Sequence, residues 1–539
     1  IKFSKTALEV IQLINQTKKN IFLTGKAGSG KTTLLKEIIS TTFKNTVVVA
    51  PTGIAAINAN GVTIHAQFQI APCCYIPDNF IAIDNSNIAF ENIATIQKNC
   101  FSRISSQKLK VIRNMELLVI DEVSMLRADL LDLLNLKLQL IRKNANPFGG
   151  VQVLFVGDLF QLPPIIKNEE WAVLKKYYTS VYFFDSMVLK KDPLIYMELK
   201  DLYRQNDPIF IAILENIRKN LLIAPDLEIL KKCIQKNIQF INYKGYIVLT
   251  THNYKADNIN RQSLATITKK SVFLKATISD DFPEKMFPLE ETMELKVGAQ
   301  VMCIKNDPSI IKQYYNGKIG FVKSIQEDCI EVQFPEEEKT VEIERFTWEN
   351  IQYKTNNNTQ LIEQEVLGKF KQFPLKLAWA ITVHKSQGLT FEKAILDVAQ
   401  VFSAGQLYVA LSRLKSLQGL IILDSIQLNG LSLDLKIAHF INQISANQQI
   451  EKILEVESKN YLIEYFIKMF YWDDFIFSLK EHLATYQQID TEVEKSAQFD
   501  WAMDWVKKIQ DAHLISQKFI QKINEFKMDN LDQLINRSI

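Results

Sequence analysis

The segment GKAGSGKT, residues 25–32, has the residue types and the spacing that bind the phosphates of a nucleotide. Its glycines allow the backbone to curl so that peptide N–H groups face the β-phosphate, and Lys31 is placed to reach the β- and γ-phosphates. The Thr32 hydroxyl is placed to hold Mg²⁺. The residues that we expect to line the phosphates are Gly25, Ala27, Gly28, Ser29, Gly30, Lys31, Thr32 and Thr33. The alternative is a glycine-rich turn that only caps a helix. An apolar run precedes the loop and a helix pattern follows it, which favours an ATP site.

Two neighbouring acids, Asp121 and Glu122, end the apolar run LLVI at 117–120. We expect Asp121 to bind Mg²⁺ directly or through water, and Glu122 to orient and deprotonate the attacking water. Without the phosphate loop, the same pair would be interpreted as a helix cap or as surface charge. Gln161, in GDLFQLPP after a further apolar run, is a candidate for holding the water or sensing the γ-phosphate.

Two distant arginines are candidates for completing the site. Arg204 lies in LYRQ and Arg413 lies in YVALSR. An arginine beside the transferring phosphoryl group stabilises its spread charge and is worth on the order of 10³–10⁵ in rate. A lone arginine is usually part of a surface ion pair, so this role depends on the resemblance given below.

The elements that must position these residues follow an alternating pattern of strands and helices. Apolar runs at 21–23, 46–50, 117–121 and 153–158 predict buried strands of a parallel sheet, whose ligands bind at the carboxyl ends of the strands. A second such pattern begins near residue 197, with strands predicted at 246–251 and 394–398.

Three segments depart from this pattern. Residues 73–105 lack strong periodicity and predict a small insertion. Alternation at Val332 and Phe334, and again at Val341 and Ile343, predicts a half-buried hairpin with a turn at 335–339. From about residue 441 onward the sequence contains no glycine or proline, and the pattern predicts helices at 450–481 and 496–527, each burying an aromatic face.

The composition excludes several classes of protein. A length of 539 residues predicts about three or four domains. The net charge of +3 neither supports nor excludes nucleic acid as a partner. None of the six cysteines forms a C-x-x-C pair, which disfavours zinc and redox sites and suits a reducing cytosol. No signal peptide is visible, and the apolar stretch 461–472 is too short for a membrane span and predicts a buried helix.

About ten of these segments occur in an order that resembles the PIF-type helicases, in the RecD-like branch of helicase superfamily 1. The resemblance covers roughly residues 1–430 and includes APTGIAAINANGVTIHAQF, LLVIDEVSML, LTTHNYKADNIN and LAWAITVHKSQGLTF. It implies an α/β protein with two RecA-like P-loop motor domains, at 1–196 and 197–440, and ATP with Mg²⁺ between them. It also implies a wedge insertion at about 73–105 and an SH3-like β insertion at about 290–372, followed by a helical C-terminal region at 441–539.

The same resemblance implies a DNA helicase that moves 5′ to 3′ on single-stranded DNA. Its expected substrates include duplex, forked and G-quadruplex DNA, and its expected processes are replication, recombination, repair and telomere maintenance. We expect a monomer in the bacterial cytosol. The residues that the resemblance places on DNA are Thr52, Gly53, His65, Phe68, Thr251, His252, Asn253, His384, Lys385, Ser386 and Gln387. Core packing is the alternative for His65, Phe68 and His384.

Two departures from the family and two rival functions stay open. The family's adenine-reading glutamine before the phosphate loop has no counterpart in FSKTALEV at 3–10, and Gln12 and Gln16 are substitutes. The last 100 or so residues lie outside the family core, so the helices there support the motor or bind DNA or a partner. An ATP-dependent loader that separates no strands is the alternative function, and a DNA-binding protein with an inactive ATPase is the other rival.

Overall fold

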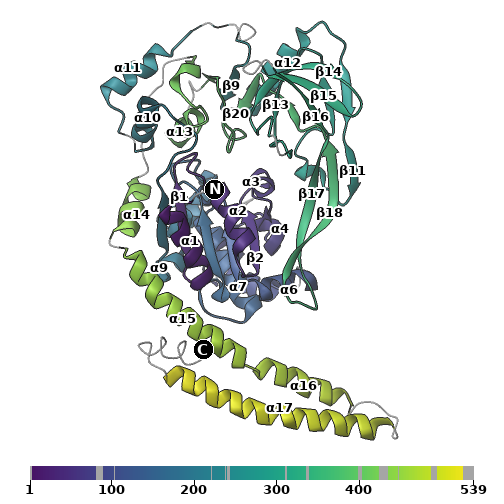
Figure 1. Ribbon diagram of the computed structural model, residues 1–539. Helices are drawn as coiled ribbons and strands as arrows, with labels where there is room; N and C mark the ends of the chain where they lie inside the picture. Colours follow the sequence, from purple (N-terminus) through teal and green to yellow (C-terminus); the bar gives the residue numbers. More distant parts are fainter. Residues whose placement is uncertain are drawn as a thin grey trace. The chain divides into compact units, whose positions relative to one another are not determined.

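The computed structural model describes residues 3–79, 89–101, 104–219, 221–236, 238, 243–309, 312–334, 339–397, 404–423, 435–446, 448–486 and 494–525. The chain divides into two compact units (Figure 1). The first comprises Ile1–Ala7 and Asn20–Gln448, and the second comprises Leu8–Lys19 and Gln449–Ile539. None of the helices in the described segments has the length and apolar content that a membrane crossing requires.

A parallel sheet of six strands forms the base of the first unit. Its order is β3-β2-β6-β7-β1-β8, with bounds Val62–Thr63, Thr46–Ala50, Leu117–Ile120, Gln152–Val156, Ile21–Gly25 and Ile195–Leu199. The four strands predicted from apolar runs are confirmed as β1, β2, β6 and β7. Nearly all residues of these four strands are buried, because helices cover both faces of the sheet.

The helices of this first motor domain are mostly short. Their bounds are α2 Lys31–Thr41, α3 Gly53–Asn58, α4 Ile64–Phe68, α5 Ile93–Asn99, α6 Ser106–Asn114, α7 Ala128–Arg142, α8 Asn168–Leu174 and α9 Met187–Lys191. Helix α1, Lys5–Gln16, belongs largely to the second unit. Within the predicted wedge at 73–105, β4 (Cys74–Ile76) pairs in parallel with β5 (Phe90–Asn92). Residues 80–88 and 102–103 of that wedge lie outside the described residues.

A second parallel sheet carries the second motor domain, in the order β20-β9-β21-β22. Its strands are Ala380–Thr382, Ile247–Thr250, Ala394–Asp397 and Leu420–Ile422, so the strands predicted at 246–251 and 394–398 are confirmed. The accompanying helices are α10 Pro208–Arg218, α11 Ala224–Lys232, α12 Asn253–Ala265 and α13 Ala404–Leu411.

Antiparallel strands interrupt this second domain. The larger sheet has the order β16-β15-β14-β13-β19, with bounds Lys339–Glu344, Cys329–Phe334, Ile319–Ile325, Gln300–Cys303 and Leu375–Leu377. The predicted hairpin is confirmed as β15 and β16, in which Val332 faces Val341, while residues 335–338 of its turn lie outside the described residues. The smaller strands are β10 Val272–Lys275, β11 Thr277–Asp280 and β12 Thr292–Leu295.

A long hairpin, β17 (Phe346–Thr355) with β18 (Ile362–Gln372), runs from these strands to the first motor domain and lies alongside α6 (Figure 1). Tyr353 is 4% exposed there, and its hydroxyl accepts the N–H of Val48 at 3.1 Å. The insertion therefore packs into the core of a domain about 300 residues earlier in the chain.

The predicted domain boundaries do not coincide with the packing. The division at 196/197 falls inside β8, which pairs with β1 from Ile195 to Leu199. Helix α14 (Leu435–Ser445) spans the division at 440/441 and returns to the first domain, where Phe440 stacks on Phe184 at 4.2 Å. The boundaries as a whole stay predictions.

The second unit contains three long helices, α15 (Ile450–Phe470), α16 (Asp473–Tyr486) and α17 (Glu494–Glu525). The single helix predicted at 450–481 was wrong, because α15 ends at Phe470, where Tyr471 takes an extended backbone conformation, and α16 begins at Asp473. The predicted burial was also wrong: no described residue of α15 is buried, and Trp501 of α17 is 63% exposed.

Replacing Tyr353 with Phe removes one hydroxyl and leaves the buried N–H of Val48 without this acceptor. We expect the free energy of unfolding to fall by about 1–3 kcal/mol, the range for an unsatisfied buried donor. Thermal or urea unfolding would measure it, with Tyr254→Phe as the control, because Tyr254 is 61% exposed. Equal stability of the two variants would contradict the structural role of the Tyr353 hydroxyl.

Candidate nucleotide site

The loop 25–32 lies between β1 and α2, as predicted. Gly28 and Gly30 have φ values of 85° and 87°, in the left-handed region that favours glycine. A Cβ atom on Gly28 would lie 2.5 Å from the Cβ of Arg204, in the segment between β8 and α10, so only glycine fits beneath this residue. The buried Ser29 hydroxyl has no hydrogen-bond partner among the described residues, which fits a loop built to receive a polar ligand.

Lys31 folds back over the loop. Its ammonium donates to the carbonyls of Gly25 at 2.6 Å and Lys26 at 3.1 Å. Burial lowers the pKa of Lys31, and the carboxylates of Asp158 and Glu122 oppose that shift. The cation therefore lies at the loop, where it can turn toward phosphate oxygens, and its role in binding them stays a prediction.

Asp121 and Glu122 follow β6 at the carboxyl edge of the sheet. Glu122 has φ 52° and ψ 44°, a left-handed conformation that is uncommon for glutamate, and its N–H donates to the Asp121 carboxylate at 2.8 Å. Burial raises the pKa of both acids, that of Glu122 to about 7 with a contribution from Asp121. A buried carboxyl with a pKa near neutrality is suited to accept a proton from water.

A side chain from the second motor domain reaches these acids. The Gln387 amide donates to the Glu122 carboxylate at 2.8 Å and to the Gln161 amide oxygen at 3.3 Å. Gln161 itself is 7% exposed. Gln387 was predicted to contact DNA, and the structure instead places its amide against the two residues predicted to manage the attacking water.

The two predicted arginines lie in the cleft rather than in surface ion pairs. Arg413 is 2% exposed, and its guanidinium donates to the Val409 carbonyl at 2.9 Å. Burial and the neighbouring Arg204 lower the pKa of Arg413 to about 9, while Glu122 opposes the shift. Arg204 donates to the Ser412 carbonyl at 3.2 Å. Arg413 is buried and Arg204 is half-buried, and two cations this close favour an anion between them, which supports their predicted role.

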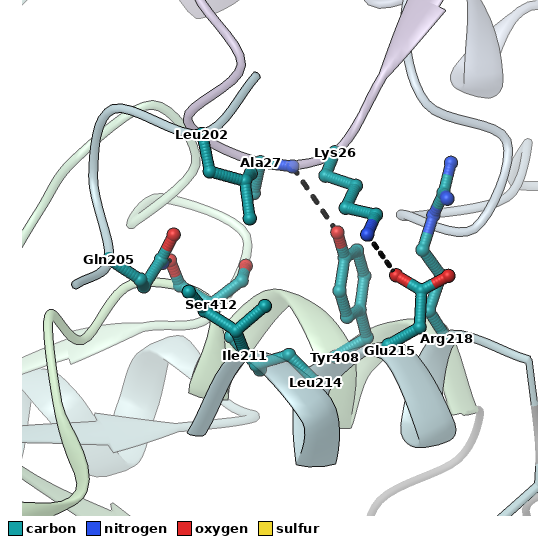
Figure 2. Close-up of a pocket in the computed structure, with 10 residues that line it drawn as sticks. All are labelled: Lys26, Ala27, Leu202, Gln205, Ile211, Leu214, Glu215, Arg218, Tyr408 and Ser412. Carbon is teal, nitrogen blue, oxygen red and sulfur yellow. Dashed lines mark hydrogen bonds and ion pairs between the residues drawn. The ribbon is translucent and has the colours of Figure 1, made fainter. Parts of the chain in front are cut away.

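Further contacts between the motor domains lie beside the loop, around a small cavity (Figure 2). The Tyr408 hydroxyl accepts the N–H of Ala27 at 3.2 Å, and Lys26 forms an ion pair with Glu215 (Figure 2). Ala27 was predicted to line the phosphates, and the structure directs its N–H to Tyr408. Sequence reasoning missed Tyr408, although it lies five residues before Arg413 in the same motif.

Asp158 and Arg218 add a buried ion pair across the same boundary, 3.2 Å long, with Asp158 0% exposed. Arg218 also lies over the Phe160 ring, 4.5 Å from its centroid. Asp158 is the last residue of the apolar run 153–158 and had no separate predicted role, and nothing in the sequence indicated Arg218. This pair fixes α10 against the segment that carries Gln161.

The donors of Thr32 and Asp121 suit Mg²⁺, which prefers oxygen ligands and keeps several positions for water and phosphate. Thr32 offers an exposed hydroxyl, and Asp121 offers a carboxylate whose Oδ1 already accepts a backbone N–H. When bound, Mg²⁺ would neutralise charge on the β- and γ-phosphates.

Most of the residues predicted to contact DNA are accessible. Gly53, Asn253, His384 and Lys385 are exposed, while Thr52, His65, Thr251 and His252 are half-buried. The hydroxyl of Thr52 accepts the N–H of Ala55 at 3.3 Å, so it caps α3 as well. The structure therefore leaves eight of these predicted contacts open to a ligand.

Two predicted DNA contacts were wrong. Phe68 is 0% exposed and packs in the core of the first motor domain, so its ring does not face solvent. Ser386 is also 0% exposed, and its hydroxyl donates to the Val383 carbonyl at 2.7 Å. Both residue types suit nucleic acid, but here they stabilise the fold.

The proposed adenine readers Gln12 and Gln16 are exposed. The Tyr203 ring lies 3.4 Å from the position that a Cβ on Gly30 would take.

Residues 3–209 match the model of the PIF1-like helicase family. The chain is 32% identical over 483 residues to the ATP-dependent DNA helicase Pif1 of Psychrobacter sp., covering 80% of this chain and 68% of that protein. It is 31% identical over 436 residues to the Danio rerio helicase PIF1, covering 78% of this chain and 61% of that protein's length. It also resembles the crystal structure of Bacteroides sp. Pif1 with ADP-AlF4, at 38% identity and a TM-score of 0.73, covering 82% of this chain and 97% of the other.

Gly28→Ala tests the close approach of Arg204 to the loop. The new Cβ would meet Arg204 at a φ of +85°, so we expect ATP turnover to fall about tenfold or more. Gly245→Ala is a matched control, because Gly245 has a φ of +80° and nothing within 4 Å of a built Cβ. Steady-state ATPase assays would measure both, and equal turnover would contradict the packing of Arg204 on the loop.

Proposed function

Because this chain belongs to the PIF1-like helicase family, we propose that it is an ATP-driven motor that moves along single-stranded DNA and separates duplex strands. Bacteroides Pif1 has also been solved bound to single-stranded DNA, which supports DNA as the track. We further propose 5′-to-3′ movement and action on forked and G-quadruplex DNA. The chain spans about three fifths of the length of its zebrafish relative, so the activity is proposed for the segment in hand.

One observation supports a motor most strongly: residues of the second motor domain contact both the phosphate loop and the candidate base of the first. Gln387 bonds to Glu122, and Tyr408 bonds to Ala27. Each contact joins a residue of the second domain to the first. A ligand that changes these contacts changes how the domains pack, which is what conversion of ATP energy into movement requires.

The chemistry assigns each side chain a task. The loop amides and Lys31 bind the β- and γ-phosphates, with Thr32 and Asp121 as the Mg²⁺ ligands. Water, held by Gln161, attacks the γ-phosphorus and loses its proton to Glu122, and the bond to the ADP oxygen breaks. Arg204 and Arg413 neutralise the charge that develops on the transferring phosphoryl group.

Movement requires that each motor domain hold DNA differently before and after hydrolysis. The first domain offers Thr52, Gly53 and His65, and the second offers His252 and Lys385. The other contacts proposed from the second domain are Thr251, Asn253 and His384. Hydroxyls, amides and lysine grip phosphates, while histidine rings stack on bases. We assign strand separation to the wedge at 73–105.

Glu122→Gln tests the catalytic assignment. The amide keeps the size of the side chain but cannot accept the proton, so we expect turnover to fall by about 10²–10⁴. Binding of a fluorescent ATP analogue should persist, because the phosphate loop is intact. Turnover near that of the unaltered chain would refute Glu122 as the base.

Unwinding of matched duplexes with a 5′ or a 3′ single-stranded tail tests the motor and its direction. We expect ATP-dependent separation of the 5′-tailed duplex, with Glu122→Gln as the inactive control. Separation of the 3′-tailed duplex alone would reverse the proposed direction. DNA-stimulated hydrolysis without separation of either duplex would instead favour a loader or switch.

A further inference from the structure

A compact turn, residues 383–388, links the second sheet to the first motor domain. It follows β20, and its backbone is held by short-range hydrogen bonds: the Ser386 N–H donates to the Thr382 carbonyl at 3.0 Å, and the Gln387 N–H donates to the His384 carbonyl at 3.2 Å. The buried Ser386 hydroxyl closes the turn onto Val383 at 2.7 Å. Such a turn moves as one piece, because displacing one residue breaks bonds to the others.

The two sides of the 383–388 turn face different surroundings. His384 and Lys385 are exposed, and they are the residues proposed to hold DNA. Gln387, two residues after Lys385, directs its amide into the nucleotide site. Its nitrogen lies 2.8 Å from a Glu122 carboxylate oxygen and 3.3 Å from the Gln161 amide oxygen.

The Gln387 amide is matched to this position. An NH₂ group carries two donors, and both find acceptors here, one on the candidate base and one on the residue proposed to hold the attacking water. A glutamate would lose both donors and place a third carboxylate beside Asp121 and Glu122. An asparagine would be one methylene too short to reach either acceptor.

We propose that Gln387 is a positioning residue that transmits DNA contact at His384 and Lys385 to Glu122 and Gln161. A phosphate bound on the outer side of the turn shifts the Gln387 amide, which sets the orientation of the base and the water, and DNA thereby sets the rate of hydrolysis. This inference rests on the proposed function, because it takes single-stranded DNA as the ligand of the outer side. Gln387 then couples DNA binding to ATP hydrolysis and does not itself contribute to DNA affinity.

The test is ATP hydrolysis by the full chain as a function of oligo(dT) concentration. Two quantities are separated: the rate at saturating DNA and the DNA concentration that gives half of the stimulation. For Gln387→Ala we expect the saturating rate to fall about tenfold or more, with the half-stimulating concentration within about twofold of the unaltered chain. Fluorescence anisotropy of a labelled oligo(dT) should show the same affinity for both proteins.

Lys385→Ala is the matched comparison on the other side of the turn. Its main effect should be a half-stimulating DNA concentration raised about fivefold or more, because a phosphate contact is lost. Gln387→Glu is the second variant of the inner side, since it keeps the shape of the side chain and removes both donors. It should lower the saturating rate as Gln387→Ala does.

Opposite results for Gln387→Ala would overturn the inference. A raised half-stimulating concentration with an intact saturating rate would make Gln387 a DNA contact, and no change in either quantity would leave it without a role in coupling. Failure of the proposed function looks different: hydrolysis by the unaltered chain would then not respond to oligo(dT) at all, and coupling through Gln387 would fall with it.

Discussion

The close packing of the second motor domain on the phosphate loop is the constraint on which the site depends. Gly28 leaves no room for a side chain beneath Arg204, and the Ala27 N–H is bonded to Tyr408. A buried ion pair between the Asp158 carboxylate and Arg218 joins the same two motor domains. A loop that binds phosphates in many folds is thereby made sensitive to the position of a second domain.

Two further features connect the first motor domain to distant parts of the chain. The β17–β18 hairpin fixes Tyr353 in the core of the first domain, far along the chain from the residues around it. The 383–388 turn has exposed residues on one side and Gln387 in the nucleotide site on the other. The nucleotide site and the proposed DNA contacts are thus only a few residues apart in the chain. A motor must couple ATP hydrolysis to DNA movement, and this turn is short enough to connect the two sites.

The features that could be predicted from the sequence are those set by a local pattern of residues. The six buried parallel strands that were predicted and the loop 25–32 need only short runs of residues, and these were placed correctly. The strands β3, β8, β20 and β22 of the same sheets were not predicted. Residues whose role depends on packing were misjudged: Phe68 and Ser386 have types suited to DNA but are buried, and Gln387 lies beside a base 265 residues away in the chain. The break between α15 and α16 depends on the extended backbone of a single residue, Tyr471, which periodicity does not reveal.

The most direct measurement is a crystal structure of this chain with ADP–aluminium fluoride and Mg²⁺. The account predicts the ligand wrapped by residues 25–33, with the Lys31 ammonium transferred from the Gly25 carbonyl to phosphate oxygens and both arginines turned toward the fluoride. A ligand bound elsewhere, with Lys31 still on the carbonyls of Gly25 and Lys26, would contradict the central claim that this cleft is where ATP acts.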